Sequence, residues 1–366
     1  MLTVKNLSTS FATEDGMVRA VDGVSFRIDK GQLFALVGES GCGKSITALS
    51  IMRLIAEPPG LLRADAVTLD DTDLLTLPER RMREVRGGRI SMIFQEPMSS
   101  LNPVFTCGSQ IVEAINLHAG IFPAQAKERT ISLLAKVGIP DPARRFSEYP
   151  HQMSGGMLQR VMIAMALSCN PQLLIADEPT TALDVTIQAQ ILDLIKELQV
   201  AENLGILLIT HDLGVVAETA DTVGVMYASR LAEIADVKDL FRAPLHPYTQ
   251  SLFRSLPRLG AKKDRLETIP GSVPNPLEFP PGCTFHPRCF LTKALAKAGA
   301  ADTMEVDSAG ESIRVLTRCA QSRPPLREVK PGHWCSCWEC EGFAEGKETD
   351  PSAKPAFSGT GAPTNE

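Results

Sequence analysis

The chain contains 366 residues, of which 44% are hydrophobic and 22% charged, and its formal net charge is −6 at pH 7. This length suggests two domains or one domain with appendages, and the acidic balance gives no sign of a surface for nucleic acid. Apolar runs are far shorter than a membrane span and the N-terminal segment lacks a signal-peptide pattern, so we expect a cytoplasmic location with membrane contact only through partners.

Residues 1 to about 240 alternate short apolar segments with amphipathic helices, which predicts an α/β sheet. Strands are predicted at Phe34–Val37, Ile90–Phe94, Leu173–Ala176 and Ile206–Thr210, and helices are predicted to begin near Ser45, Ser154 and Thr186. A helical apolar period within residues 96–150 predicts a helical insertion between two parts of the sheet, at about residues 96–155.

A glycine-rich turn follows the first of these strands. It reads Gly38-Glu39-Ser40-Gly41-Cys42-Gly43-Lys44-Ser45 and fits G-x-x-x-x-G-K-[S/T] between a strand and a helix. The glycines let backbone N–H groups surround phosphates, and the helix N-terminus adds partial positive charge. Lys44 can reach the β- and γ-phosphates, and the Ser45 hydroxyl can ligate Mg²⁺. The segment predicts a nucleotide-phosphate site, with an accidental glycine turn as the alternative.

A second anion site is predicted at Ser154-Gly155-Gly156, where a helix begins. Ser154 is a good N-cap, and the two glycines leave the first N–H groups of the helix open. Because one chain with one triphosphate loop does not need two such sites, we expect this one to bind the γ-phosphate held by another chain. An ordinary capped helix is the alternative.

Polar residues follow two of the predicted strands. Asp177 and Glu178 end the run Leu173–Ala176, which suits Asp177 to Mg²⁺ and Glu178 to polarising an attacking water as general base. His211 follows Ile206–Thr210, where it can hydrogen-bond a γ-phosphate and that water. The alternatives are a loop that begins with two acids and a structural histidine.

The sequence changes in character after Leu240, where prolines are frequent and the apolar residues no longer follow a regular period. Six of the nine cysteines lie between residues 283 and 340, which in a reducing cytosol favours metal binding over disulfides. Residues 341–366 are rich in Gly, Pro, Ser, Thr and charge and are predicted to be disordered. The expected division is therefore 1–240, 241–340 and 341–366.

These motifs, in this order, resemble the nucleotide-binding subunit of ABC transporters over roughly residues 1–235. The resemblance implies a P-loop ABC ATPase core with an antiparallel β subdomain and a helical subdomain, followed here by an irregular, cysteine-rich extension. It also implies roles for three further residues: Gln95 as a Mg²⁺ and water contact linked to the membrane subunits, Phe11 as the ring that stacks on adenine, and Asp184 in the D-loop. Met157 replaces the commonest signature glutamine, but Ser154 and both glycines are intact.

Three segments resemble the dipeptide, oligopeptide and nickel importer branch of this family, namely Phe94–Pro103, His151–Arg160 and Pro244–Gln250. The branch resemblance implies a peptide importer ATPase, with nickel as the alternative cargo. It also implies a second, related cassette that forms a heterodimer with this chain, two membrane-spanning permease subunits and a substrate-binding protein, with this chain on the cytoplasmic face of the inner membrane.

The same branch carries a C-terminal region in which four cysteines can hold a [4Fe–4S] cluster, and the matching ligands here are Cys283, Cys289, Cys319 and Cys337. Twenty-nine residues separate Cys289 from Cys319, more than is usual in the family. Tetrahedral zinc, free thiols and the use of Cys335 or Cys340 remain open. Two rival functions also remain, a soluble ABC ATPase acting on DNA or ribosomes and a tail that senses metal or redox state.

Overall fold

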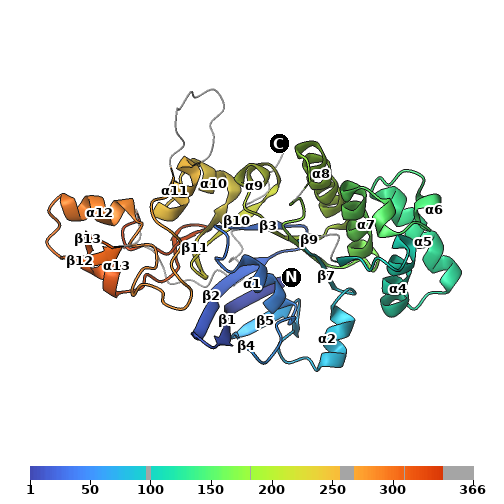
Figure 1. Cartoon of the computed structure of the whole chain (residues 1–366), viewed down its shortest axis with the longest axis horizontal. Coiled ribbons are helices and arrows are strands. Elements are labelled where there is room, and N and C mark those ends of the chain that lie inside the picture. Colours follow the sequence, from blue (N-terminus) through green and yellow to red (C-terminus); the bar gives the residue numbers. More distant parts are fainter. Residues whose placement is uncertain (96–99, 182, 256–267, 309, 341–366) are drawn as a thin grey trace, which may run out of the picture.

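The computed structural model of the chain describes residues 1–95, 100–181, 183–255, 268–308 and 310–340. The predicted disordered tail at 341–366 and the first residues of the predicted helical insertion, 96–99, lie outside these ranges. Figure 1 shows a central sheet, with a group of helices at one end and a small helix-and-hairpin unit at the other.

The central sheet has eight strands in the order β14-β15-β11-β10-β3-β9-β8-β7. Neighbouring strands from β10 to β7 are parallel, whereas β11, β15 and β14 are added antiparallel at one edge. Its strands are β3 (Leu33–Val37), β7 (Ile90–Ile93), β8 (Leu173–Asp177), β9 (Gly205–Ile209), β10 (Thr222–Tyr227), β11 (Arg230–Asp236), β14 (Arg327–Lys330) and β15 (His333–Cys335). The four predicted strands are confirmed, with bounds shifted by one residue.

A second, antiparallel sheet packs below the first. In order it contains β2 (Gly16–Ile28), β1 (Leu2–Thr13), β5 (Ala66–Leu69) and β6 (Thr72–Asp73), with β4 (Gly60–Arg63) paired to β1. It shares one apolar core with the underside of the main sheet, where Phe26 stacks on Phe34 at 4.9 Å. This sheet is the antiparallel β subdomain that the family resemblance implies.

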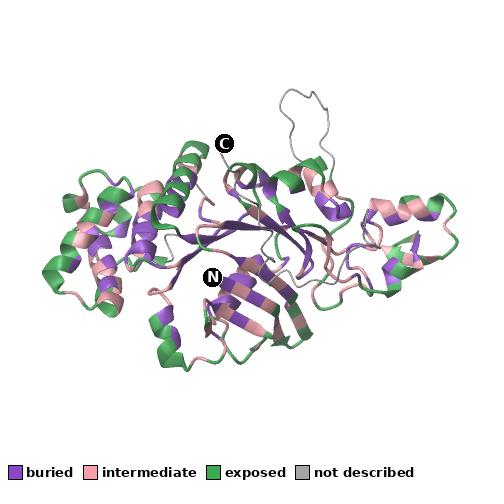
Figure 2. Cartoon of the chain, turned by 180° about the vertical axis from the view of Figure 1, so that it is seen from behind, coloured by how far each residue is buried: buried purple, intermediate pink, exposed green. Residues whose placement is uncertain are grey.

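Helices cover the sheets and form the end group (Figure 1). They are α1 (Lys44–Ile51), α2 (Glu79–Val85), α4 (Cys107–Ala119), α5 (Pro123–Lys136), α6 (Pro142–Arg145), the 3₁₀ turn η1 (Pro150–Gln152), α7 (Gly155–Leu167), α8 (Val185–Glu202), α9 (Leu213–Thr219), α10 (Val237–Arg242) and α11 (Pro247–Arg254). The helices α4 to α6 fall inside the predicted insertion. Figure 2 shows their outer faces exposed and the central strands buried, as the all-apolar strand sequences require.

The C-terminal extension is more regular than its sequence suggests. It contains α12 (Phe290–Lys297), the hairpin β12 (Thr303–Ser308) and β13 (Glu311–Leu316), α13 (Thr317–Gln321), and then β14 and β15. The prediction of an irregular extension is therefore corrected in part: the two last strands join the main sheet through β11, with Glu233 opposite Cys335. Because β15 of the extension pairs with β11 of the core, the core and the extension share the main sheet. In the described ranges no helix is long and apolar enough to cross a bilayer.

Candidate active site

The glycine-rich turn lies at the edge of the sheet where the parallel strands end. It links β3 to α1, and Lys44 is buried at its end. Gly43 has φ +104°, and a Cβ there would lie 2.1 Å from the Ala20 carbonyl oxygen, so the position requires glycine. The Lys44 ammonium donates to the Gly38 oxygen at 2.9 Å and to the Glu39 oxygen at 3.2 Å, which keeps its charge inside the loop.

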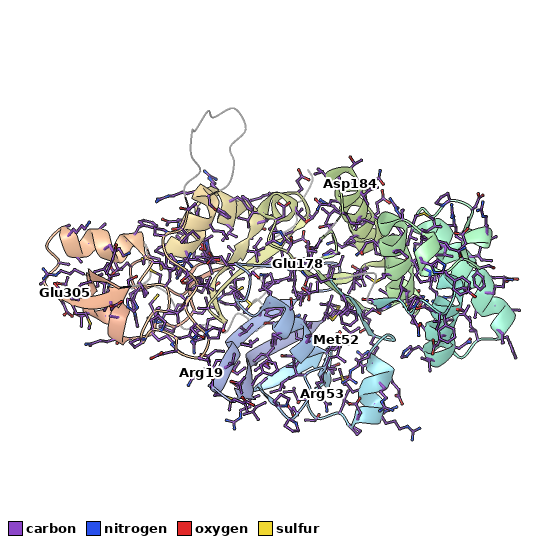
Figure 3. All side chains as sticks on the ribbon, viewed as in Figure 1. Arg19, Met52, Arg53, Glu178, Asp184 and Glu305 are labelled. Atoms are coloured by element: carbon purple, nitrogen blue, oxygen red, sulfur yellow. The ribbon has the colours of Figure 1, made fainter. Side chains whose placement is uncertain are left out.

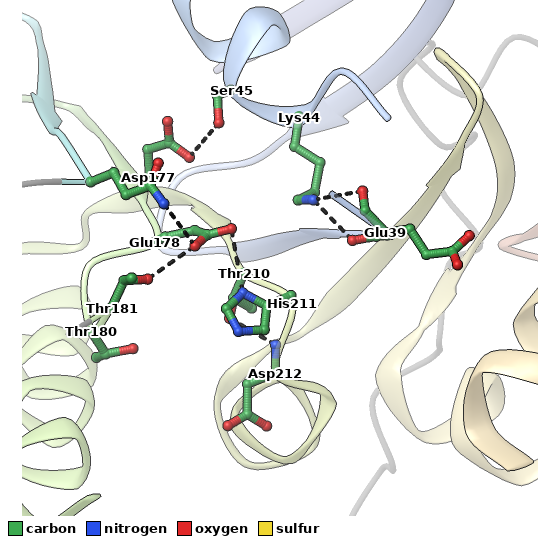
Figure 4. A network of polar contacts seen from close by, with 12 residues as sticks. Glu39, Lys44, Ser45, Asp177, Glu178, Thr180, Thr181, Thr210, His211 and Asp212 are labelled. Carbon is green, nitrogen blue, oxygen red and sulfur yellow. Dashed lines mark hydrogen bonds and ion pairs between the residues drawn. The ribbon is translucent and has the colours of Figure 1, made fainter. Parts of the chain in front are cut away.

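Asp177 and Ser45 form the first contact between this loop and the neighbouring strands. The Ser45 hydroxyl donates to Asp177 Oδ1 at 3.0 Å (Figure 4). Burial raises the pKa of Asp177, while this hydrogen bond and Lys44 act against the rise. A hydroxyl and a carboxylate at this distance are the hard oxygen donors that Mg²⁺ prefers. The two residues therefore fit the predicted metal site.

Glu178 is the centre of a small polar network. Its Oε2 accepts from Thr181 Oγ1 at 2.9 Å and from Gln95 Nε2 at 3.2 Å, and its Oε1 lies 3.4 Å from His211 Nδ1. Figure 4 shows the Thr181 and His211 side chains directed toward the carboxylate, Thr181 from the loop that carries Glu178 and His211 from the loop after β9. The structure thus brings Gln95, Glu178 and His211 together, as the sequence predicts.

The backbone at Glu178 is itself unusual, because φ is +46°. A residue with a side chain seldom adopts this conformation, and such positions concentrate at functional sites. Its N–H donates to the Ile209 carbonyl oxygen at 2.9 Å, across to the strand that precedes His211. This bond fixes the relative positions of the two strand ends.

Other predicted residues lie apart from this network. Ser154 caps α7 by accepting the Met157 N–H, and Asp184 caps α8 by accepting the Ile187 N–H. Among the described residues no hydrogen bond or ion pair joins Ser154, Gly155 or Gly156 to the phosphate loop, and Figure 1 places α7 with the helical end group. Phe11 is part of β1, paired with Gly60 and Val18, and is half-buried.

Sequence reasoning missed three side chains that contact these residues. Thr181 lies three residues after Glu178 and contacts it through both its N–H and its hydroxyl. A threonine this close to Glu178 in the sequence is the local signal that could have found it. Tyr248 and Arg288 both contact Glu39 from the extension. They belong to segments that the sequence already marks, but no local pattern connects those segments to the phosphate loop.

The four predicted cysteine ligands line one pocket, together with His246 and His286. Burial raises the pKa of the Cys283 thiol to about 12 and that of Cys289 to about 11, and it also raises those of Cys319 and Cys337. Cys335 and Cys340 pack beside Leu245 and do not line this pocket. Cys337 belongs to both groups, because it lines the pocket and also packs with Cys335 and Cys340.

A preformed site for a single ion is not found there. In the ranges that the structure covers, no group of three or more His, Cys, Asp or Glu side chains is placed to hold one metal ion.

Two family profiles match the chain. The profile described as "ABC transporter" matches residues 21–181, which include the phosphate loop, Ser154 and Glu178. The profile described as "Oligopeptide/dipeptide transporter, C-terminal region" matches residues 232–294, which include Tyr248 and the first two cysteines of the pocket.

Curated relatives cover most of the chain. The probable peptide ABC transporter ATP-binding protein y4tR of Sinorhizobium fredii is 48% identical over 92% of this chain and 94% of its own length. The dipeptide transport ATP-binding protein DppD of Haemophilus influenzae is 52% identical over 79% of this chain and 87% of its own length. The oligopeptide transport ATP-binding protein AppD of Bacillus subtilis is 54% identical over 79% of this chain and 88% of its own length.

Solved structures share the core. The ATP-binding cassette MJ0796, in a dimeric post-hydrolysis state bound to ADP and Pi, superposes with a TM-score of 0.58 at 25% identity, covering 65% of this chain and 99% of its own. An ATP-binding subunit of an ABC transporter superposes with a TM-score of 0.53 at 29% identity, over 66% of this chain and 92% of its own.

Proposed function

This chain belongs to the ABC transporter ATP-binding proteins of the oligopeptide and dipeptide import family, and we propose that it powers import of di- and oligopeptides by hydrolysing ATP. One observation carries the enzymatic part: the phosphate loop, Asp177, Glu178 and His211 meet at one edge of the sheet. ATP hydrolysis needs a phosphate cradle, oxygen ligands for a metal and a base near the γ-phosphate, and these residues supply all three.

We assign the roles of the individual side chains from the family resemblance. Lys44 and the N–H groups of Gly38–Ser45 bind the phosphates, and Phe11 stacks on the adenine. Ser45 and Asp177, with Gln95, would hold Mg²⁺, which neutralises phosphate charge when bound. Glu178 accepts the proton of the attacking water, and His211, 3.4 Å from it, orients that water against the γ-phosphate.

The site is completed by a second cassette. Ser154, Gly155 and Gly156 have no bond to this chain's own phosphate loop, yet they form a capped helix N-terminus suited to an anion. We place them, with Asp184, against ATP bound to the facing cassette, which the family resemblance makes a related chain. The similarity to a dimeric cassette with ADP and Pi supports this arrangement.

The remaining partners are two membrane-spanning permease subunits and, through them, a substrate-binding protein. The chain would dock on the cytoplasmic face of the inner membrane, with closure of the cassette pair pulling on the permeases through the helical insertion near Gln95. Exposed apolar side chains on that insertion, including Val104, Phe105 and Phe122, support a protein contact there. No nucleic-acid partner is proposed.

We also propose that Cys283, Cys289, Cys319 and Cys337 hold a [4Fe–4S] cluster. The observation that supports this is that all four side chains line one pocket, as the ligands of a single cluster must. When bound, the cluster would join three separate segments of the extension and so stabilise its fold.

An uptake assay tests the cargo. Cells that contain the complete importer should take up a labelled dipeptide or oligopeptide, and Lys44→Ala should abolish this uptake while leaving Ni²⁺ uptake unchanged. The relatives named for peptide transport favour this outcome. Loss of Ni²⁺ uptake with intact peptide uptake would instead assign the chain to nickel import.

A further inference from the structure

The phosphate loop is contacted by side chains from the C-terminal extension. Glu39, the second residue of the loop, receives two of them. The Arg288 guanidinium donates to both carboxylate oxygens of Glu39, at 2.8 and 3.0 Å, and the Glu39 N–H donates to the Tyr248 hydroxyl oxygen at 3.0 Å. Arg288 lies 249 positions further along the chain, so this contact is a product of the tertiary fold alone.

Arg288 is held in place before any ligand arrives. Its side chain is only 6% exposed, its Nε donates to the Pro270 oxygen at 2.9 Å, and its guanidinium lies 5.7 Å from the centre of the Tyr227 ring. Burial alone would lower the pKa of Arg288, but the Glu39 carboxylate and the Tyr227 hydroxyl raise it. A buried guanidinium with this many fixed partners keeps its geometry, which favours the two-pronged bond to Glu39.

Tyr248 fixes the backbone of the same residue. It is fully buried at the start of α11, where its ring packs against Tyr227 at 4.6 Å and Phe285 at 5.5 Å. Burial raises the pKa of Tyr248, so its hydroxyl stays neutral and its oxygen stays available to the Glu39 N–H. The orientation of the peptide between Gly38 and Glu39 therefore depends on the extension.

The charge of Glu39 makes this contact matter for binding. A carboxylate inside a loop that receives a triphosphate repels it unless a cation compensates. Figure 4 shows the Glu39 side chain directed away from Asp177 and Glu178. Its carboxylate lies 2.8 Å from the Arg288 guanidinium, which compensates the negative charge, while the Lys44 ammonium stays inside the loop on the Gly38 and Glu39 carbonyl oxygens.

We propose that Arg288 and Tyr248 are positioning residues for ATP binding, by which the C-terminal extension completes the phosphate loop. This inference rests on the proposed function only in taking Gly38–Ser45 as the ATP phosphate site. It adds that nucleotide affinity depends on two residues outside the ABC core, Tyr248 in α11 and Arg288 next to Cys289.

The test measures the Kd for a fluorescent ATP analogue on the purified full-length chain. Arg288→Gln should raise the Kd about tenfold, because it leaves the Glu39 charge uncompensated, and Tyr248→Phe should raise it a few-fold. Arg288→Lys keeps the positive charge but cannot make the two-pronged bond to Glu39, so its Kd should lie between those of Arg288→Gln and wild type. In the assembled importer, Arg288→Gln should raise the KM for ATP by a similar factor and leave kcat within about twofold of wild type.

Two controls separate positioning from folding. Arg314→Gln removes an exposed ion pair of the same extension, between Arg314 and Glu305, and should leave the Kd unchanged. The double variant Glu39→Gln/Arg288→Gln removes both charges and should return the Kd to within about threefold of wild type. Thermal unfolding of each variant confirms that it is folded. If Arg288→Gln does not fold, the Kd of Arg288→Lys is compared with that of wild type instead.

The outcomes are distinct. A folded Arg288→Gln with a wild-type Kd overturns the inference and leaves the ATP site intact, since Lys44→Ala still abolishes binding. A double variant no better than Arg288→Gln also overturns it, because the defect then comes from lost structure. A wild-type chain that binds no ATP, and is unaffected by Lys44→Ala, overturns the proposed function itself.

Discussion

At the scale of single residues, Glu178 combines an uncommon backbone conformation with three side-chain partners. Its φ is +46°, its Oε2 accepts hydrogen bonds from Gln95 and Thr181, and its Oε1 lies beside His211. Both carboxylate oxygens are therefore held in place by neighbours. Such pre-arrangement removes the cost of orienting the base when substrate binds. Of its partners, His211 is exposed and so remains free to turn toward the γ-phosphate.

Glu178→Gln should therefore lower ATP hydrolysis in the assembled importer by at least about 100-fold, because the amide keeps the contacts but accepts no proton. ATP should remain bound and hold the cassette pair closed. Phosphate release reports hydrolysis, and gel filtration with ATP reports the closed pair.

Glu305→Gln is the matched control for this experiment, since Glu305 lies on the distant hairpin (Figure 3). It should hydrolyse ATP at the wild-type rate. A Glu178→Gln importer that hydrolyses ATP as fast as wild type would show that another residue is the base.

At the scale of elements, the junction of β11, β15 and α11 depends on one buried carboxylate. Glu233 is fully buried; its oxygens accept the N–H groups of Leu245 at 2.7 Å and His246 at 3.0 Å, and Oε1 lies 2.6 Å from His333 Nε2. Removing one partner of a buried polar network leaves the others unsatisfied. This carboxylate therefore links the ABC core to the strands that follow the cysteine pocket.

Glu233→Ala should lower the free energy of unfolding by about 3–5 kcal/mol, because it leaves two buried N–H groups and a buried histidine without their hydrogen-bond acceptor. Urea denaturation of the full-length chain measures this loss. Glu311→Ala, an exposed position on β13, should change the stability by less than about 0.5 kcal/mol. A Glu233→Ala protein as stable as this control would refute the linking role.

The cysteine pocket supports a second prediction at this scale. Cys283→Ala/Cys289→Ala should lose the iron, the acid-labile sulfide and the brown absorbance that wild type shows when it is purified without air. The matched variant Cys335→Ala/Cys340→Ala should keep them, because those thiols lie outside the pocket. A colourless, iron-free wild-type protein would contradict the cluster proposal.

At the scale of the whole molecule, we propose that the catalytic site is divided between two chains. The phosphate loop and Glu178 lie together, whereas among the described residues no hydrogen bond joins the helix N-terminus at Ser154 to either of them. We expect the purified chain to bind ATP normally but to hydrolyse it at least about 100-fold more slowly than the assembled importer, because one set of γ-phosphate donors is missing. Steady-state ATPase assays on the chain and on the importer compare the two rates, and equal rates would contradict a shared site.

The parts that the sequence predicts correctly are those with local patterns. Buried strands and capped helices can be recognised from short runs of neighbouring residues. Asp177 and His211 come to one edge of the sheet because the strands that precede them, β8 and β9, are parallel neighbours. The return of β14 and β15 to the main sheet was not predictable, because their short segments have no period. The partner of β15 is β11, about one hundred residues earlier, and β14 pairs only with β15. Arg288 was missed as a partner of Glu39 for the same reason.

The 249 positions between Glu39 and Arg288 also set an order of events during synthesis. At about 5–20 residues per second, Arg288 is joined to the growing chain about 12 to 50 s after Glu39. Throughout that interval the phosphate loop carries its acidic residue without the cation that neutralises it. By the proposal above, a nascent cassette reaches its full affinity for ATP only when Arg288 has left the ribosome and joined Glu39.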